Sequence, residues 1–270
     1  MMTLNQKLYD LFAAKANEEK IDILSLGLGY TAVALSGGGI GLSYTHFESK
    51  KSCMVLNKHI DYESRPAIQL LEKIKSENTI ERSMALALVN ALNYNNALAL
   101  PEDVDNKIMY EKFGIRKNTR TAMVGYFGPL VRTFDKMEVS LEILDASRGL
   151  GQKEEFYDKL KNWAQVLLLT STSILNNTAE EILANAGEEL KTVMLGPSTP
   201  MVADAFKHLP VHMLAGTVPL DKEKILKAIR HGMGTPVLHR YSRKVYWSLQ
   251  PQTGTSIVDE KNILSIQKQP

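Results

Sequence analysis

Small hydroxyl residues and glycines gather in the second half of the sequence, at points where apolar runs end. They are Phe127, Gly128 and Pro129; Asp145 with Arg148; Thr170, Ser171 and Thr172, with Asn176 and Thr178; Ser198 and Thr199; and Gly216 and Thr217. Such residues leave backbone N–H groups accessible, and at a helix N-terminus these groups attract anions. The same residue types are also ordinary caps and turn formers, so a single segment carries little weight. Several segments meeting at one edge predict a pocket for a small, anionic ligand.

The elements expected around these segments form a doubly wound parallel sheet. Short apolar runs predict strands over residues 121–124, 139–144, 166–170, 192–195 and 211–215, the last ending in Gly216 and Thr217, with helices between them. Continuous apolar strands separated by helices are typical of a parallel sheet covered on both faces. In that topology every loop after a strand lies at the same edge, where ligands bind in open α/β folds.

The interval from Gly125 to Asp145 resembles a dinucleotide-binding unit in spacing only. Such a unit has a glycine turn after its first strand and an acidic residue about 20 positions later. Here Phe127 stands where a second close-approach glycine is expected, and its ring would obstruct a pyrophosphate. We therefore do not expect a conventional NAD site. Asp145 can instead cap the turn that follows it.

The first half of the sequence predicts an α+β organisation. Strands are expected over 21–28, 31–35 and 40–44 in an antiparallel meander, followed by a buried helix over 79–94. Tyr30 and Thr31, at the junction of two strands, are further candidate ligand-binding residues. Asn90 and Asn93 need partners on the buried helix, either backbone groups between the domains, which we favour, or groups in a cleft. The polar segment 101–118 is expected to link domains that span 1–114 and 115–270.

Composition narrows the classes of partner. Lys and Arg total 32 against 30 Asp and Glu, a net charge of +2, which gives no reason to expect nucleic acid. No apolar stretch is long enough to predict a membrane span, and Met1 to Lys20 lacks a signal-peptide core. Cys53 is the single cysteine, so no intrachain disulfide can form, and a cytoplasmic location fits. None of the six histidines belongs to a zinc-binding pattern. A metal carried within an organic chelate would need no protein ligands.

Three segments carry a resemblance to a known family. They are Gly125-Tyr126-Phe127-Gly128-Pro129, the run from Leu169 to Thr178, and Gly196-Pro197-Ser198-Thr199-Pro200-Met201. They resemble the signatures of the "putative heavy-metal chelation" family, whose function is otherwise unknown. Gly27 to Ala32 and the helix from Glu81 to Asn93 resemble its usual N-terminal partner. The resemblance implies an enolase-N-terminal-like domain followed by a Rossmann-like domain. It also implies a site in the cleft between them, which a homodimer could complete.

Two functional hypotheses remain open from the sequence. The first is a protein that binds or handles a small anionic or metal-chelating ligand in the interdomain cleft, in heavy-metal homeostasis or cofactor assembly. The second is an enzyme, a lyase or transferase, that acts on a small metabolite in the same cleft. No nucleophile elbow or P-loop is present to identify a reaction. The cofactor is unknown; a metal ion within a chelate is one candidate.

Overall fold

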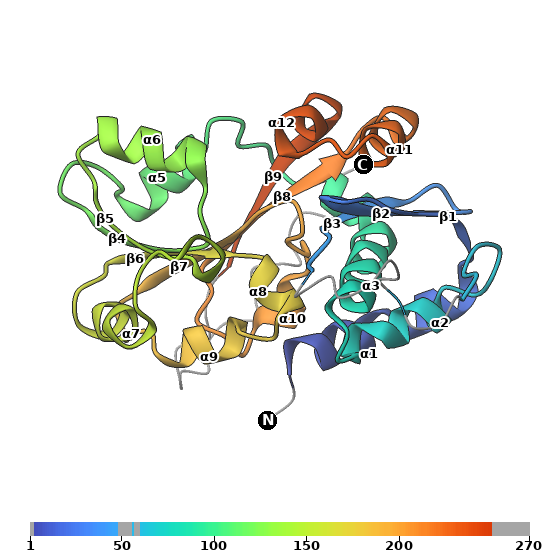
Figure 1. Cartoon of the computed structure of the whole chain (residues 1–270), viewed down its shortest axis with the longest axis horizontal. Coiled ribbons are helices and arrows are strands. Elements are labelled where there is room, and N and C mark those ends of the chain that lie inside the picture. The colour runs from blue at the N-terminus through green and yellow to red at the C-terminus, as the bar shows by residue number, and fades with distance from the viewer. Residues whose placement is uncertain (1–2, 48–55, 57–59, 250–270) are drawn as a thin grey trace, which may run out of the picture.

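The computed structural model describes residues 3–47, 56 and 60–249, which form two β-sheets flanked by helices (Figure 1). The smaller sheet has three antiparallel strands, and the larger has six strands in the order β5-β4-β6-β7-β8-β9. No helix in these ranges is both long and apolar enough to cross a membrane.

The three-stranded sheet is the predicted meander. Its strands are β1 (Ile21–Leu26), β2 (Tyr30–Leu35) and β3 (Ile40–Tyr44), preceded by α1 (Leu4–Glu18) and followed by α2 (Ile68–Leu71), the 3-10 helix η1 (Glu72–Lys75), α3 (Thr79–Leu92) and α4 (Tyr94–Leu98). Helix α3 lies directly on β3. A β-carbon at Gly41 would lie 2.2 Å from the carbonyl oxygen of Ala87, so only glycine permits this close approach.

The six-stranded sheet begins after the short helix α5 (Lys107–Phe113). Its strands are β4 (Arg120–Val124), β5 (Ser140–Leu144), β6 (Val166–Thr170), β7 (Lys191–Leu195), β8 (Met213–Pro219) and β9 (Ser242–Ser248). The connecting helices are α6 (Gly128–Lys136), η2 (Ala146–Arg148), α7 (Lys153–Asn162), α8 (Thr172–Leu175), α9 (Ala179–Ala184), α10 (Ala203–Phe206), α11 (Lys222–Arg230), α12 (Thr235–Leu238) and η3 (His239–Tyr241).

Helices cover both faces of this sheet, which confirms the predicted fold class. Phe134 of α6 and Met109 of α5 pack with Leu168 on one face. On the other face, Phe156 of α7 and Phe206 of α10 belong to the core that includes the opposite side of β6. The strands from β4 to β8 are parallel, and β4, β6 and β7 are buried over nearly their whole length, which explains their apolar sequences.

Three local features differ from the sequence-based expectations. The segment expected to be a plain linker contains α5, whose first amides donate to the Asp103 carboxylate. The sixth strand, β9, runs antiparallel to β8 and closes the edge of the sheet. Gly216 and Thr217 lie inside β8 rather than after it, because β9 extends the pairing as far as Pro219.

Helices α11 and α12 pack on the other sheet. Ile225 and Ile229 of α11 and Leu238 of α12 share a core with Tyr30 and Leu42. Strand β2 is therefore buried at every residue, with α3 on one face and α11 on the other (Figure 1). The division of the chain into domains at 114/115 stays a prediction.

Candidate functional site at the carboxyl edge of the parallel sheet

The strand order of the larger sheet changes direction between β4 and β6. The chain passes from β4 to β5 on one side and then returns to place β6, β7 and β8 on the other. The loops after β4 and β6 consequently leave in opposite directions, and ligands of open α/β sheets bind in the crevice at such a point. The first place to look for a ligand site is therefore the carboxyl edge beside these two strands.

Successive loops touch one another along this edge. Gly125, which follows β4, has φ +83°, and a β-carbon there would lie 3.0 Å from Thr170 Cβ at the end of β6. Gly196, which follows β7, has φ +128°, and a β-carbon there would lie 2.7 Å from Ser171 Oγ. Both glycines combine a left-handed backbone with close contact, which other residues tolerate poorly. The loops after β4, β6 and β7 thus lie side by side, as the sequence predicts.

A tyrosine ring and two guanidinium groups gather where β4 ends. The Tyr126 ring is 39% exposed, and the Arg148 guanidinium lies over it, 4.7 Å from the ring centroid. A β-carbon at Gly128 would lie 3.4 Å from Tyr126 Cε1 and 3.5 Å from an Arg132 terminal nitrogen. Both arginines are exposed. We call Tyr126, Arg132 and Arg148 the edge cluster.

Two elements position the edge cluster. Helix α6 begins at Gly128, with Pro129 in its first turn, and carries Arg132 one turn later. The positive end of its dipole therefore lies beside Tyr126. The 3-10 turn η2 carries Arg148 and is capped by Asp145, which accepts hydrogen bonds from Arg148 N at 3.2 Å and Ser147 Oγ at 2.6 Å. This confirms Asp145 as a cap of the turn after β5, and its carboxylate also lies 3.9 Å from Arg148 Nε.

The remaining candidates near β4 and β6 are Phe127, the segment from Thr170 to Thr172, Asn176 and Thr178. Phe127 is partly buried and packs against the core cluster that includes Leu130 and Phe134 of α6. Thr170 and Thr172 pair through their hydroxyls at 3.0 Å, at the end of β6, and Ser171 is 1% exposed. Asn176 and Thr178 lie past α8 and pair with each other, with the Thr178 hydroxyl 2.7 Å from Asn176 Oδ1. The last two residues are not held at the edge by any of these contacts.

Ser198 and Thr199 join the two sheets. Ser198 Oγ accepts a hydrogen bond from Tyr44 N at 2.7 Å, and the side chain is 1% exposed. The carbonyl of Ser198 accepts from Asn90 Nδ2 at 3.3 Å, and Asn93 Nδ2 donates to the Met201 carbonyl at 2.6 Å. Both asparagines therefore donate to backbone carbonyls, Asn90 also to that of Leu42 at 2.8 Å, as the preferred interpretation expects.

A small cavity lies beside the contact between the two sheets. Thr199 and Thr217 line a cavity of about 10 Å³, which is room for about one water molecule. Gly216 faces Met201, since a β-carbon there would lie 2.6 Å from Met201 Sδ. Thr199, Gly216 and Thr217 therefore line a closely packed contact between the sheets.

The two candidates from β2 are also engaged within the protein. The Tyr30 hydroxyl lies 2.6 Å from Thr235 Oγ1, and Thr31 Oγ1 lies 2.9 Å from Thr45 Oγ1. Burial raises the pKa of Tyr30 above its usual value. Both side chains are nearly inaccessible, at 7% and 0% exposure.

The described residues do not fit a directly coordinated heavy metal. Soft metals prefer thiolate and imidazole ligands. Within residues 3–47, 56 and 60–249, no three His, Cys, Asp or Glu side chains are grouped so that they could hold an ion. Cys53 and His59 lie outside these residues. His212 Nδ1 accepts from Thr192 N at 3.1 Å, and burial lowers the pKa of this imidazole.

The sequence placed Arg148 at this edge beside Asp145, but it did not indicate Tyr126 or Arg132 as site residues. Tyr126 lies within a glycine turn, and a single arginine in a helix is most often a solvated charge, so neither residue type indicates a site. The available signal was spacing: an arginine three residues after the cap Asp145, and another four residues after the helix start at Gly128. Neither spacing reveals that Arg148 lies over the Tyr126 ring or that Arg132 and this ring both lie beside Gly128.

Comparisons with known proteins agree with this fold. A family model, DUF364, described as "Putative heavy-metal chelation", matches residues 109–248, and a second model with the same description, DUF4213, matches residues 9–93. An uncharacterized protein of Methanocaldococcus jannaschii is 21% identical over 256 residues, covering 89% of this chain and 95% of the relative.

Two solved structures of DUF364-family proteins with unknown function are also similar. One, from Pyrococcus horikoshii, has a TM-score of 0.76 at 22% identity and covers 92% of this chain and 100% of its own. The other, from Desulfitobacterium hafniense, has a TM-score of 0.70 at 18% identity and covers 90% and 99%. At these identities the two structures support the fold.

Proposed function

Because the chain belongs to the DUF364 family, which is described as "Putative heavy-metal chelation", we propose that it binds a small anionic molecule at the edge cluster. A metal ion already enclosed in an anionic chelate is one such molecule. The observation that carries the proposal is the exposed Arg148 guanidinium over the exposed Tyr126 ring, with the exposed Arg132 guanidinium on the same side of Gly128 as that ring, at the switch point between β4 and β6.

The chemistry of these groups favours carboxylates and phosphates. A guanidinium group presents parallel N–H donors that match a carboxylate or phosphate in a bidentate geometry. The dipole of α6 adds positive potential at the same place. The Tyr126 ring supplies a flat apolar surface for the body of the ligand.

A metal that is already bound by an organic chelator would fit both the family description and the scarcity of metal-binding side chains. The described residues offer no group of three metal-binding side chains, so direct coordination has no support there. A chelated ion is already coordinated by its organic ligand, whose outer carboxylates are anions. In this proposal the metal is cargo, and Arg132 and Arg148 bind the periphery of the chelate.

Isothermal titration with citrate, inorganic phosphate and the Zn(II)–EDTA chelate tests the proposal. Two unit charges about 4 Å apart at a surface interact by about 1–2 kcal/mol, so Arg148→Gln is expected to weaken binding roughly fivefold to thirtyfold. Arg132→Gln is expected to act in the same direction. Arg230→Gln, at an exposed arginine of α11, is the matched control.

The pattern across variants decides the outcome. Loss in the two edge variants but not in the control, with weaker binding at higher salt, supports the proposal. Equal affinities in all variants, or binding of none of the three anions, would refute it. Elemental analysis with native mass spectrometry of the purified protein identifies whether a bound species carries a metal.

A further inference from the structure

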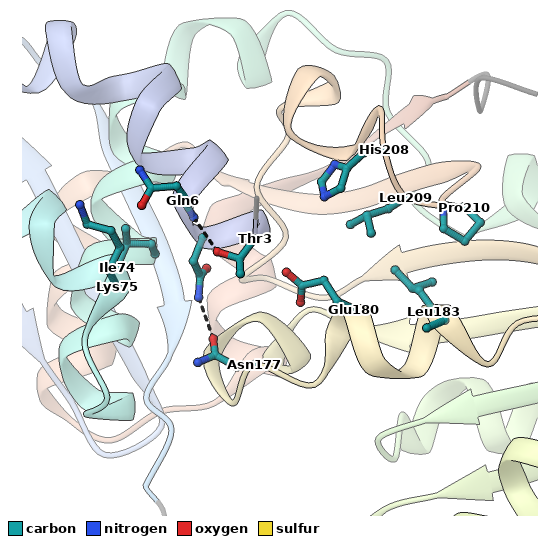
Figure 2. A pocket seen from close by; sticks show the side chains of 12 residues that line it. Thr3, Gln6, Ile74, Lys75, Asn177, Glu180, Leu183, His208, Leu209 and Pro210 are labelled. Carbon is teal, nitrogen blue, oxygen red and sulfur yellow. Dashed lines mark hydrogen bonds between the residues drawn. The ribbon is translucent and has the colours of Figure 1, made fainter. Parts of the chain in front are cut away.

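A larger pocket lies where the N-terminal helices meet the larger sheet. Its volume is about 640 Å³, and it is lined by α1, η1, α9 and the loop before β8 (Figure 2). A pocket of this size is typical of small-molecule sites. The loop before β8 lies at the amino end of that strand, whereas the edge cluster follows the carboxyl ends of β4 and β5. The pocket is therefore separate from the edge cluster.

The pocket offers apolar surface that a ligand can reach from water. Ala184 at the end of α9 and Pro210 before β8 line it and are exposed. Behind them, Leu183 and Leu209 are 3% and 8% exposed, so they back this surface with packed core. Covering these side chains stabilises the binding of an apolar group.

Two charges of opposite sign line the same pocket. Lys75 is exposed and Glu180 is partly exposed, and neither forms a salt bridge among the residues that the structure describes. Lys75 Nζ lies 3.5 Å from the centroid of the Tyr9 ring, a contact that leaves the ammonium group charged. Glu180 Oε1 accepts a hydrogen bond from Leu4 N at 2.7 Å. Within the described ranges its other oxygen, Oε2, has no partner and is not buried, so both charges remain open to a ligand.

The two charges are held at different points along α1. Leu4, which contacts Glu180, and Tyr9, which contacts Lys75, are five residues apart, or about 7.5 Å along the helix axis. Residues five apart also point in directions about 140° apart around that axis. Figure 2 shows Lys75 and Glu180 on either side of Gln6. A single ligand that meets both charges must therefore carry a positive and a negative group separated by several bonds.

Two side-chain amides of the lining have complementary groups to spare. Gln6 Nε2 donates to Asp10 Oδ1 at 2.7 Å, which leaves Gln6 Oε1 as an acceptor that is not buried. Asn177 is exposed, and its Oδ1 accepts from Asn5 Nδ2 at 2.8 Å, which leaves Asn177 Nδ2 as a donor. Neither spare atom has a partner in the described part of the chain. A peptide group, with one N–H and one C=O, matches such an acceptor and donor.

We propose that this pocket binds a short zwitterionic peptide with an apolar side chain. The terminal ammonium group of the peptide pairs with Glu180 Oε2, its terminal carboxylate pairs with Lys75 Nζ, and a peptide group between them meets Gln6 and Asn177. The apolar side chain covers the wall formed by α9 and the loop before β8. Two or three residues, at about 3.3–3.6 Å each, separate the two charges by about 7–10 Å. The inference does not depend on the anion proposed for the edge cluster.

Two-dimensional NMR with five related probes tests the inference. Ala-Leu-Ala is the zwitterion, its N-acetyl form lacks the positive charge, and its C-terminal amide lacks the negative charge. Ala-Ala-Ala lacks the large apolar side chain, and free leucine lacks the peptide groups. Ala-Leu-Ala is expected to shift the side-chain amide signals of Gln6 and Asn177. For about 19 heavy atoms, the efficiency typical of drug-sized ligands corresponds to a Kd on the order of 0.1 mM.

The expected losses follow from the group that each probe lacks. Blocking either charge is expected to weaken binding roughly threefold to tenfold, since one charge pair at the surface is lost. Ala-Ala-Ala is expected to bind roughly fivefold to thirtyfold more weakly, because less apolar surface is buried. Free leucine is expected to bind at least about tenfold more weakly, since it makes no hydrogen bonds through a peptide group.

Two charge variants with matched probes locate the ends of the peptide. Glu180→Gln keeps an oxygen that accepts from Leu4 N, and it is expected to bind Ala-Leu-Ala and its N-acetyl form equally. Lys75→Gln is expected to bind Ala-Leu-Ala and its C-terminal amide equally. Glu188→Gln and Lys227→Gln, at exposed positions outside the lining, are the controls and are expected to keep both preferences.

A third variant blocks the pocket itself. Ala184→Trp places a large ring at an exposed position of the lining and is expected to abolish peptide binding. Undiminished binding by the folded variant would overturn the inference. If this variant fails to fold, the two charge variants decide the question.

The probes supply further outcomes that would overturn the inference. Equal affinity of the wild-type protein for Ala-Leu-Ala and its N-acetyl form would do so, as would leucine binding as tightly as the tripeptide. A preference for the zwitterion that survives in both Glu180→Gln and Lys75→Gln would do the same. So would unshifted side-chain amide signals of Gln6 and Asn177 at peptide concentrations of about 10 mM, roughly a hundred times the expected Kd.

Discussion

Replacing Gly125 by alanine tests the contact between the loops after β4 and β6, on which the position of the edge cluster depends. Gly125 combines φ +83° with a neighbour at close range, because an added β-carbon would lie 3.0 Å from Thr170 Cβ and 3.1 Å from Thr170 Cγ2. Gly114 has a similar backbone, with φ +62°, but a β-carbon there would meet no atom within 4 Å. Comparing Gly114→Ala with Gly125→Ala separates the cost of backbone strain from the cost of overlap with Thr170.

The expected magnitudes follow from these two contributions. A left-handed conformation costs an alanine about 1–2 kcal/mol, which both variants experience. Overlap with the Thr170 side chain adds about 1–2 kcal/mol in Gly125→Ala alone. We therefore expect Gly114→Ala to lower the free energy of unfolding by about 1–2 kcal/mol and Gly125→Ala by about 2–4 kcal/mol.

A double variant then isolates the contact. Thr170→Ser removes Cγ2 but keeps the hydroxyl that pairs with Thr172. In the Gly125→Ala background it is expected to recover about 0.5–1 kcal/mol relative to the sum of the single changes. Urea denaturation followed by circular dichroism measures the wild-type protein, the two alanine variants, Thr170→Ser and the double variant. Equal costs for the two alanine variants, or strictly additive changes in the double variant, would show that these loops do not touch as described.

Two further predictions concern buried polar side chains. Thr192→Val is expected to raise the free energy of unfolding by about 1 kcal/mol, because Thr192 Oγ1 is fully buried without a partner in the described part of the chain; an unchanged or lower value in urea denaturation would contradict this. Burial, aided by the charge of Lys244, lowers the pKa of His239 to about 4. The unfolded chain therefore takes up this proton first, near pH 6.5, and stability is lost as pH falls from about 6.5 to about 4. The ring is partly exposed, so solvent screening reduces the effect. Between pH 6.5 and pH 4, the free energy of unfolding of His239→Gln is expected to fall by about 1–2 kcal/mol less than that of the wild type. Parallel plots of unfolding free energy against pH for the two proteins would contradict this prediction.

The sequence predicted the regular elements better than their ends and partners. The apolar runs that became β4, β6 and β7 are buried on both faces, so their hydrophobicity alone identified them. Strand β9 has a mixed burial pattern because it lies at an edge, and its pairing with β8 depends on residues distant in the chain. Because of that pairing, Gly216 and Thr217 lie within β8 and not in a loop after it.

For the candidate site, too, some features could be predicted from the sequence and others could not. The contact between the loops after β4 and β6 follows from topology, and the glycines indicated where it would occur. The partners of individual side chains did not follow, because Ser198 meets Tyr44 and Asn5 meets Asn177 across more than a hundred residues of sequence. Composition of a loop cannot reveal that its hydroxyl is already paired. The predicted ligand-binding residues as a set stay a prediction.

The packing of α11 and α12 on the small sheet has a consequence during synthesis. One face of β2 and β3 is complete once Tyr44 has left the ribosome, but its cover at Lys222–Arg230 is translated about 180 residues later. At roughly 5–20 residues per second, this interval lasts roughly 10–40 s. We expect the nascent chain to present an uncovered apolar sheet for that time and to depend on ribosome-associated chaperones until its last helices emerge.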